Sequence, residues 1–345
     1  MPDHPLIPVG AGAELYAQAT EPAETPDPAP DGDGGIWYPL IEDVVGVTEQ
    51  WSYATGGRVR SGVAIADGTA VVGSSDNNVY GIDISDGTEQ WSYATGDDVD
   101  SGVAIEDGTA VVGSDDNNVY GIDITDGTEQ WSYETGGSVR SGVGIADGTA
   151  VVGSGDDHVY GIDITDGTEQ WSYEAGSQVE SGVAIADGTA VVGSSDNNVY
   201  GLNINDGSEQ WSYETGSFVE SGVAIEDGTA VVGSNDDNVY GIDISDGTEQ
   251  WSYATEGRIE SGVAIEDGTA VVGSFDNNVY GIDISDGTEQ WSYETGDDVD
   301  SGVAIEDGTA VVGSFDNNVY GLLQQIEQRY EAPRISTGTE WASEL

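Results

Sequence analysis

The sequence contains no cysteine and no lysine, and its 345 residues include two histidines and one methionine. The absence of cysteine excludes a disulfide framework, a thiolate zinc site and a catalytic thiol. With only His4 and His158 available, neither a histidine-pair metal site nor a Ser-His-Asp triad is expected. No apolar run approaches the roughly 20 residues of a membrane span, and the N-terminus lacks the basic and apolar segments of a secretory signal. We therefore predict a cytoplasmic protein, provided that the gene start is correctly placed.

Positive charge is nearly absent as well. The chain has 66 acidic residues against six basic ones, all arginines, so its formal net charge is −60 at pH 7. Such a surface repels nucleic acid and anionic membranes, so neither is an expected partner. An acid-rich composition without lysine resembles that of proteins from halophilic archaea, because a Debye length of about 3 Å at molar salt screens the self-repulsion. We predict a monomer adapted to high salt.

What the chain does contain is a repeat of 40 residues. The triplet "EQW" recurs at this spacing from Glu49 to Glu289, "VVGS" recurs from Val71 to Val311, and "VYG" recurs from Val79 to Val319. A period near 40 with short apolar runs and many glycines is typical of the blades of a β-propeller. Helical repeats would need glycine-free amphipathic stretches of about 10 residues, and residues 49–321 contain none.

Each unit divides into four predicted strands, named A to D. In the first complete copy, strand A covers residues 59–65, strand B 70–75, strand C 79–84 and strand D 89–95. The Asp-Gly pairs at Asp67 and Asp86 predict type I′ turns, in which both central residues have positive φ. Each unit is therefore predicted to be an antiparallel meander that covers its faces by stacking on its neighbours around an axis.

The two ends of the repeated region predict how the ring closes. The chain enters the repeats with strand D at Thr48 and leaves them after strand C at Leu323. Pairing the N-terminal strand with the last A–B–C set gives an all-β, seven-bladed propeller without an open edge. Residues 1–35 are predicted to be a disordered arm, 36–323 the propeller, and 324–345 a tail with a short helix ending at Pro333. The segment "TGTEWAS" from Thr337 resembles strand D, and it either competes for the closing position or begins an eighth, incomplete blade.

One line of the repeat resembles a known family. Gly81, Asp83, Asp86, Gly87 and Trp91 occupy positions 1, 3, 6, 7 and 11 of the line "A-x-D-x-x-T-G-x-x-x-W", which is found in propellers of the pyrroloquinoline-quinone (PQQ) enzyme repeat family. The match recurs at Gly121–Trp131, Gly161–Trp171, Gly241–Trp251 and Gly281–Trp291, and at Gly201–Trp211 with Asn203 for the first aspartate. The chain departs from the family by Gly for Ala and Asp for Thr, and the resemblance covers about 275 residues.

The resemblance implies a structural role for the tryptophans, which in the family dock onto the neighbouring blade. A large flat ring with one N–H donor suits such a contact. The implied belt consists of Trp51, Trp91, Trp131, Trp171, Trp211, Trp251 and Trp291.

The family's quinone chemistry is not expected here. Its dehydrogenases have eight blades, a calcium ion held by acidic and amide side chains, a catalytic aspartate and often a vicinal disulfide, whereas this chain has seven units and no cysteine. The "DNNVYG" segment from Asp76 also departs from the calcium-loop pattern, because Tyr80 occupies a ligand position. Fold alone does not grant function. The sequence is more similar to the family's scaffold branch, close to the propeller that assists outer-membrane protein assembly in bacteria, so we predict no catalytic residue, cofactor or metal.

Differences between the copies collect on one face. The A–B and C–D turns are nearly invariant, whereas the D–A connections and the start of the B–C turns vary, and both of these lie at the same end of the strands. All three phenylalanines, Phe218, Phe275 and Phe315, belong to this face in consecutive units. They form either an apolar contact site for a partner or local packing over neighbouring blades.

One position of strand A is ionisable in every copy. Because strand A is innermost, these residues are predicted to form a ring at the mouth of the central channel, where they either pair with one another or hold a cation or a basic side chain. The ring consists of Arg60, Asp100, Arg140, Glu180, Glu220, Glu260 and Asp300.

These observations predict a non-enzymatic scaffold that binds another protein through the D–A and B–C connections. A carbohydrate- or small-ligand-binding propeller is the alternative, although a lectin with one pocket per blade would keep its sites alike. A quinone-dependent dehydrogenase is the third possibility.

Overall fold

A computed structural model describes residues 50–306 and 308–323 of the chain. The predicted disordered arm and the predicted C-terminal helix lie outside these residues. Within them the protein is all-β, in agreement with the sequence prediction, and its strands form seven antiparallel sheets. No helix in the described part is long and apolar enough to cross a membrane.

The sheets follow the repeat in order along the chain. Six of them contain four strands and the last contains three. The first three sheets are β1 (Ala64–Ala66), β2 (Thr69–Ser74), β3 (Asn78–Asp83), β4 (Glu89–Ala94); β5 (Val103–Glu106), β6 (Thr109–Gly113), β7 (Asn118–Asp123), β8 (Glu129–Glu134); and β9 (Gly144–Ala146), β10 (Thr149–Gly153), β11 (His158–Asp163), β12 (Glu169–Glu174). The others are β13 (Val183–Ala186), β14 (Thr189–Gly193), β15 (Asn198–Asn203), β16 (Glu209–Glu214); β17 (Val223–Glu226), β18 (Thr229–Gly233), β19 (Asn238–Asp243), β20 (Glu249–Ala254); β21 (Val263–Glu266), β22 (Thr269–Gly273), β23 (Asn278–Asp283), β24 (Glu289–Glu294); and β25 (Val303–Glu306), β26 (Thr309–Gly313), β27 (Val319–Leu323).

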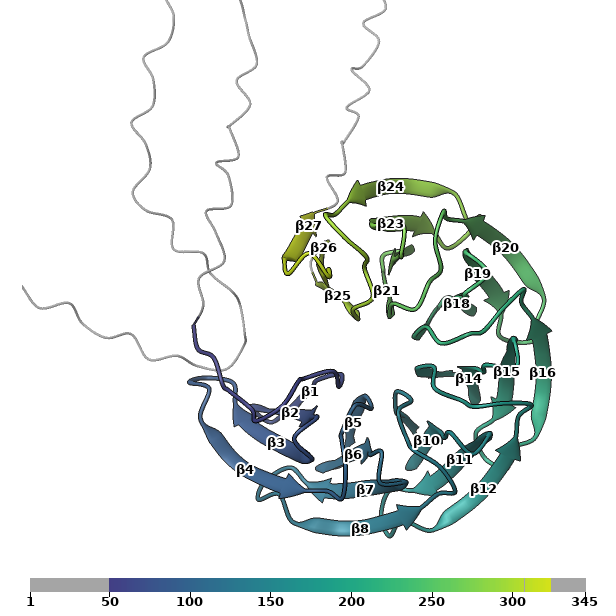
Figure 1. Cartoon of the computed structure of the whole chain (residues 1–345). Helices are drawn as coiled ribbons and strands as arrows, with labels where there is room; N and C mark the ends of the chain where they lie inside the picture. Colours follow the sequence, from purple (N-terminus) through teal and green to yellow (C-terminus); the bar gives the residue numbers. More distant parts are fainter. Residues whose placement is uncertain (1–49, 307, 324–345) are drawn as a thin grey trace, which may run out of the picture. The chain divides into compact units, whose positions relative to one another are not determined.

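The sheets stand side by side around an axis as propeller blades. The first strand of each sheet lies nearest the axis and the fourth lies outermost (Figure 1). Successive sheets contact each other through their innermost strands, from β1 with β5 to β21 with β25. The described residues leave an opening between the first sheet and the last (Figure 1).

Two details of strand A differ from the prediction. The strand is shorter than expected: β1 begins at Ala64 rather than at residue 59. Before β1 the Ser61 hydroxyl accepts a hydrogen bond from the Gly73 backbone N–H (2.7 Å), and in the second sheet the Ser101 hydroxyl accepts the equivalent bond from Gly113 (2.8 Å). Gly102 lies so close to the backbone of the next unit that a Cβ there would stand 3.1 Å from the Cα of Gly142. A side chain at this position would press on the neighbouring backbone, so glycine favours the close approach of the innermost segments.

The turns also divide into two kinds. The A–B turn has the predicted type I′ signature, with φ of 48° at Asp67 and 81° at Gly68. The C–D turn does not, because only Gly87 has positive φ there, and its N–H donates to the carbonyl of Asp83 (2.8 Å) across a longer turn. The type I′ prediction was therefore wrong for the C–D turn.

Strand D carries a β-bulge in every four-stranded sheet. In the first sheet Gly81 faces Trp91 and Ile82 faces Glu89, so Gln90 is the extra residue. The bulge lays the indole over the glycine, where a Cβ would stand 2.1 Å from the ring. The tryptophan of the invariant "EQW" therefore packs directly on the glycine that follows "VY".

The protein's core lies between the sheets. Each cluster joins one sheet's valines and tryptophan to the alanine, valine, tyrosine and isoleucine of the next, as in the cluster around Trp171, Val192 and Leu202. The apolar residues at these interfaces are almost fully buried.

The predicted closing strand is only partly described. Trp51 packs against the first sheet and donates its Nε1–H to the carbonyl of Ile84 (2.8 Å), and Trp51 and Tyr53 cover Tyr80 and Ile82. The segment with Trp51 and Tyr53 therefore packs on the first sheet as the fourth strand of each sheet packs on the sheet that follows it. Among the described residues β27 pairs with β26 alone, so its pairing with the N-terminal strand stays a prediction.

A tyrosine–aspartate pair repeated in the sheets predicts how stability depends on pH. Burial would raise the pKa of Asp196, but hydrogen bonds from Tyr200, Asn198 and Gly176 outweigh it and lower that pKa; burial and then Asp196 raise the pKa of Tyr200. A lowered aspartate pKa stabilises the fold above its unfolded value near 3.9, and this contribution is lost as the pH falls. A raised tyrosine pKa stabilises the fold below about pH 10, and this contribution is lost at higher pH.

We therefore expect unfolding, followed by circular dichroism in about 2 M KCl to screen the net charge, to show an acid limb and an alkaline limb. Tyr200→Phe should lower the free energy of unfolding by about 1–2 kcal/mol at neutral pH and weaken the alkaline limb. An unchanged profile in that variant would contradict the assignment.

Candidate partner face and channel mouth

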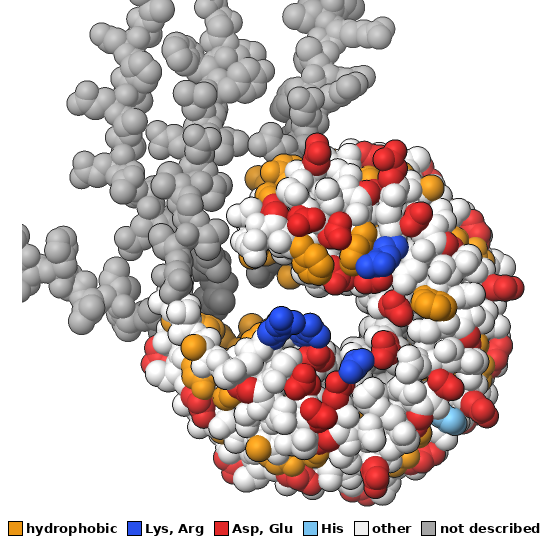
Figure 2. All heavy atoms as spheres, viewed as in Figure 1, with side chains coloured by type: hydrophobic (Ala, Val, Ile, Leu, Met, Phe, Trp, Pro, Cys, Tyr) orange, Lys and Arg blue, Asp and Glu red, His pale blue; other side chains and the backbone are white. Residues whose placement is uncertain are grey.

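The D–A and B–C connections form one face of the sheets, here called the mouth face, around the end of the central channel. The meander places both connections at the same ends of the strands, and Figure 2 views this face. The described residues include four arginines, Arg58, Arg60, Arg140 and Arg258, and the arginine side chains visible in blue in Figure 2 gather around the channel. Within the described residues, the arginine charge is thus concentrated at one place on an acidic protein.

Two of the three phenylalanines form a pair on the mouth face. The rings of Phe275 and Phe315 meet edge to face, with centroids 6.4 Å apart. The Arg258 guanidinium carbon lies 3.9 Å from the centroid of the Phe275 ring, in cation–π geometry. Phe275 is half-buried beneath these neighbours, whereas Phe315 is 59% exposed.

Phe218 stands apart from this pair. Its side chain is 48% exposed and makes no ring contact within the described residues. Its backbone carbonyl accepts a hydrogen bond from the Asn235 N–H (2.9 Å), which fixes the loop and not the ring. Local packing therefore accounts for Phe275 but not for Phe218 or Phe315, whose rings remain exposed to solvent.

The arginines of the predicted charge ring pair with neighbouring acids. Arg140 holds Asp115 through Nε and Nη2 (2.8 and 2.7 Å) and approaches Glu180 at 3.7 Å. Arg60 lies 3.4 Å from Asp100. Part of the ring is thus mutually paired, as one of the two interpretations of the sequence expected.

The remaining acids of the ring lie close to one another. Burial raises the pKa of Glu180, Glu260 and Asp300, while Arg140 or Arg258 partly offsets it. Glu220 accepts a hydrogen bond from the Asn235 amide (2.9 Å). Arg258 pairs with Glu260 through Nε (2.9 Å) as well as covering Phe275. The described residues contain no group of three or more acidic or histidine side chains arranged to hold a metal ion.

The tryptophans lie at the sheet-to-sheet interfaces. Trp91, Trp131, Trp171, Trp211 and Trp251 are each 6% exposed, and each donates Nε1–H to the carbonyl in the C–D turn of the next sheet, at 2.6–2.8 Å. Trp51 makes the same bond while half-buried. Trp291 differs, because its buried Nε1 has no hydrogen-bond partner among the described residues.

Two features of the mouth face were not predicted from the sequence. One is the stacking of Arg258 on Phe275, and the other is the pairing of Asp115 with Arg140 across two sheets. A signal for the second existed in the repeat. In three units the first residue of the B–C turn contacts the ionisable strand-A position 25 residues later, and the other two pairs are Ser75 with Asp100 and Ser195 with Glu220.

Comparisons with known proteins agree with this fold. The sequence profile of the outer membrane protein assembly factor BamB family matches residues 46–139, 135–218 and 217–329. Among solved structures, BamB from Moraxella catarrhalis has 18% identity and a TM-score of 0.68, covering 78% of this chain and 86% of its own. The computationally designed protein Ika8 has 22% identity and a TM-score of 0.69, covering 76% and 82%. No curated protein matches the sequence.

Proposed function

Because the chain belongs to the family of the outer membrane protein assembly factor BamB, we propose that it is a non-enzymatic scaffold that binds another protein through the mouth face. The observation that carries this proposal is the Phe275–Phe315 pair beside Arg258, in which the Phe315 ring is exposed and the Phe275 ring is half-buried. It lies on the one face where otherwise nearly identical units differ. A partly exposed aromatic pair flanked by arginine has the composition of an interaction hot spot.

The variation between units favours a protein over a repeated small ligand. The D–A connections read "GGRV", "GDDV", "GGSV", "GSQV", "GSFV", "EGRI" and "GDDV" in successive units. A sugar-binding propeller with equivalent pockets would keep them alike, whereas one extended partner contacts each blade differently. A high-salt habitat belongs to the same proposal, because the −60 charge requires screening.

The test is an affinity capture from a lysate of the source cells in about 2 M KCl, where surface charges are largely screened. Three baits are compared: the native chain, the triple variant Phe218→Asp, Phe275→Asp, Phe315→Asp, and a control with Ser172→Asp, Ser212→Asp, Ser252→Asp. The control adds the same charge at exposed positions of the outermost strands β12, β16 and β20.

We expect a protein that the native chain and the control retain and the phenylalanine variant loses. Equal retention by all three baits would contradict the proposed face. If no protein is retained by any bait, a glycan array probed in the same salt tests the alternative.

A further inference from the structure

Every A–B turn of the repeat contains an Asp-Gly pair, whose chemistry depends on the glycine N–H. When that N–H has no hydrogen-bond partner, the nitrogen can attack the side-chain carboxyl carbon of the aspartate and close a succinimide ring. Glycine obstructs this attack least, because it has no side chain. Water then opens the ring, and opening at the original main-chain carbonyl leaves isoaspartate.

The glycine N–H of an Asp-Gly pair is bound in some turns of the structure. In every described C–D turn it donates to a main-chain carbonyl of the same turn, as Gly87 does to Asp83 (2.8 Å). Two A–B turns use a glutamate of the preceding sheet instead. Gly148 donates to Glu106 (3.2 Å), and the equivalent bond joins Gly268 to Glu226 (2.9 Å). Each glutamate is the last residue of strand A in its own sheet.

The A–B turns of the second, fourth and fifth sheets lack this glutamate. In the sheet before each of them, alanine ends strand A, and these residues are Ala66, Ala146 and Ala186. The methyl group offers no acceptor. Three glycine N–H groups therefore have no hydrogen-bond partner within the described residues, namely those of Gly108, Gly188 and Gly228.

The two kinds of A–B turn have the same backbone conformation. The φ angles are 50° and 77° at Asp187 and Gly188, and 51° and 75° at Asp147 and Gly148. Both aspartates are exposed to solvent. The difference between the turns is therefore the partner of the glycine N–H.

A bound glutamate opposes succinimide formation in two ways. The attacking nitrogen must lose its proton, and the carboxylate both holds this proton and disfavours the amide anion by its negative charge. The hydrogen bond also ties the turn to the preceding sheet. This restrains the rotation that brings the nitrogen to the carboxyl carbon.

We propose that Asp107, Asp187 and Asp227 are sites of isoaspartate formation, and that Asp147 and Asp267 are protected by the preceding sheet. The glycine nitrogen bonds to Cγ of the neutral carboxyl group, the bond from Cγ to its hydroxyl oxygen breaks, and the N–H proton leaves with that hydroxyl as water. Hydrolysis adds one water back, so the mass is unchanged and no oxidant is consumed. The product has an extra methylene in the main chain of a two-residue turn, at the end of the strands opposite the mouth face.

The test follows isoaspartate in each turn while the full chain is incubated at neutral pH in about 2 M KCl. Chymotryptic peptides separate the turns because their flanking residues differ, and electron-transfer fragmentation distinguishes isoaspartate from aspartate. We expect the three proposed sites to react roughly three- to tenfold faster than Asp147 and Asp267, the factor that corresponds to one hydrogen bond. Equal rates in the five turns would overturn the proposal.

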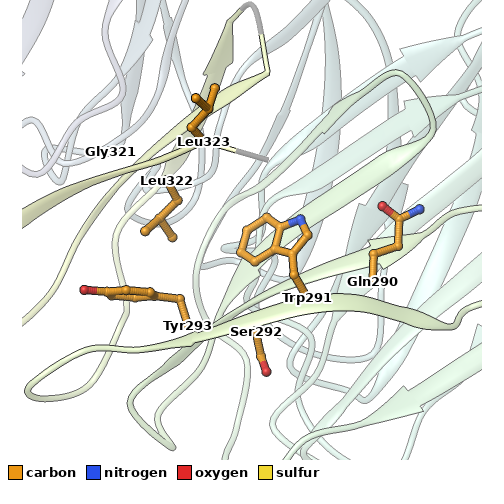
Figure 3. Close-up of a pocket in the computed structure, with 7 residues that line it drawn as sticks. All are labelled: Gln290, Trp291, Ser292, Tyr293, Gly321, Leu322 and Leu323. Atoms are coloured by element: carbon orange, nitrogen blue, oxygen red, sulfur yellow. The ribbon is translucent and has the colours of Figure 1, made fainter. Parts of the chain in front are cut away.

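The A–B turn of the last sheet is a poor reference for this comparison, although Gly308 donates to Glu266 (2.7 Å). A cavity of about 360 Å³ lies between β24 and β27, lined by Trp291 and Leu322 among others (Figure 3). Val319 of the same sheet is 75% exposed, whereas its equivalents are fully buried. The turns at Asp147 and Asp267 belong to sheets that have a described sheet on both sides, so they are the references.

Glu106→Ala tests whether the glutamate is the cause of the protection. The substitution removes the partner of the Gly148 N–H and leaves the turn itself unchanged. We expect the rate at Asp147 to rise to that at Asp187. A rate at Asp147 that stays unchanged would contradict the assignment.

The reciprocal variant is Ala146→Glu, which places a carboxylate where it can accept from the Gly188 N–H. We expect the rate at Asp187 to fall to that of the protected turns, while Asp227 and Asp267 keep their rates. Circular dichroism in the same salt shows whether each variant retains the fold. An unchanged rate at Asp187, or an equal change at all three aspartates, would count against a local effect of the glutamate.

Discussion

Replacing Trp171 by alanine is expected to lower the free energy of unfolding by about 3–5 kcal/mol. The indole is 6% exposed, packs against Val192 and Leu202 of the following sheet, and donates Nε1–H to the carbonyl of Ile204 (2.7 Å). Alanine removes both the apolar contact and the hydrogen bond at an interface between two sheets. Each sheet is covered only by its two neighbours, so no contacts elsewhere in the fold compensate for the lost contacts of the indole.

Two further substitutions separate the contributions to this loss. Trp171→Phe keeps most of the apolar area and leaves the Ile204 carbonyl unpaired, so we expect a smaller loss of about 1–2 kcal/mol. Ser172→Ala, at the exposed neighbouring position, should change stability by less than about 0.5 kcal/mol. Urea unfolding at constant KCl concentration gives the free energy of unfolding of all three variants. A loss below about 1 kcal/mol in Trp171→Ala would contradict the structural role of the tryptophan belt.

The melting temperature is expected to rise with KCl concentration. The chain carries a net charge of −60, and the ion pairs of the described residues involve three arginines and His158. Most carboxylates therefore repel one another without a basic partner. Raising KCl from 0.1 to 1 M shortens the Debye length from about 10 Å to about 3 Å. We expect a stabilisation of about 3–5 kcal/mol, or roughly 5–9 °C for a fold of this size.

A charge-reduced variant distinguishes screening from a general salt effect. Glu134→Gln, Glu174→Gln, Glu214→Gln and Glu294→Gln remove four negative charges at exposed, equivalent positions of the outermost strands. Differential scanning calorimetry should show a higher melting temperature for this variant at low salt and a shallower rise with KCl. Identical salt slopes for the two proteins would mean that the acidic surface is not the cause.

Much of the fold follows from the repeat. The alternation in "VVGS" and "VYG" predicts strands B and C, and the structure places them at Thr69–Ser74 and Asn78–Asp83. The short extent of strand A was not predictable in the same way. It depends on the approach of Gly102 to Gly142, two residues in different units, and no local pattern records how closely neighbouring segments converge on the axis.

The contacts on the mouth face were predictable only in part, and its role in binding a partner stays a proposal. Variation between units singled out the mouth face as the candidate, because differences accumulate where packing does not dictate the residue. The contact of Phe275 with Phe315 follows from equivalent positions in adjacent units. The separation of Phe218 and the stacking of Arg258 depend on loop conformations, which change with the sequence of each D–A connection.

The most direct measurement of the proposed function is crosslinking of the native partner from defined positions. Phe218→Cys places a single thiol on the mouth face, and Ser245→Cys places one in the C–D turn of the same sheet, at the opposite end of the strands. Each variant is labelled with a maleimide photo-crosslinker and illuminated in lysate at about 2 M KCl, where charge-driven contacts are screened. The scaffold proposal predicts that one protein is linked from residue 218 and not from residue 245. Linkage from residue 245 alone, equal linkage from both, or none from residue 218 would contradict it.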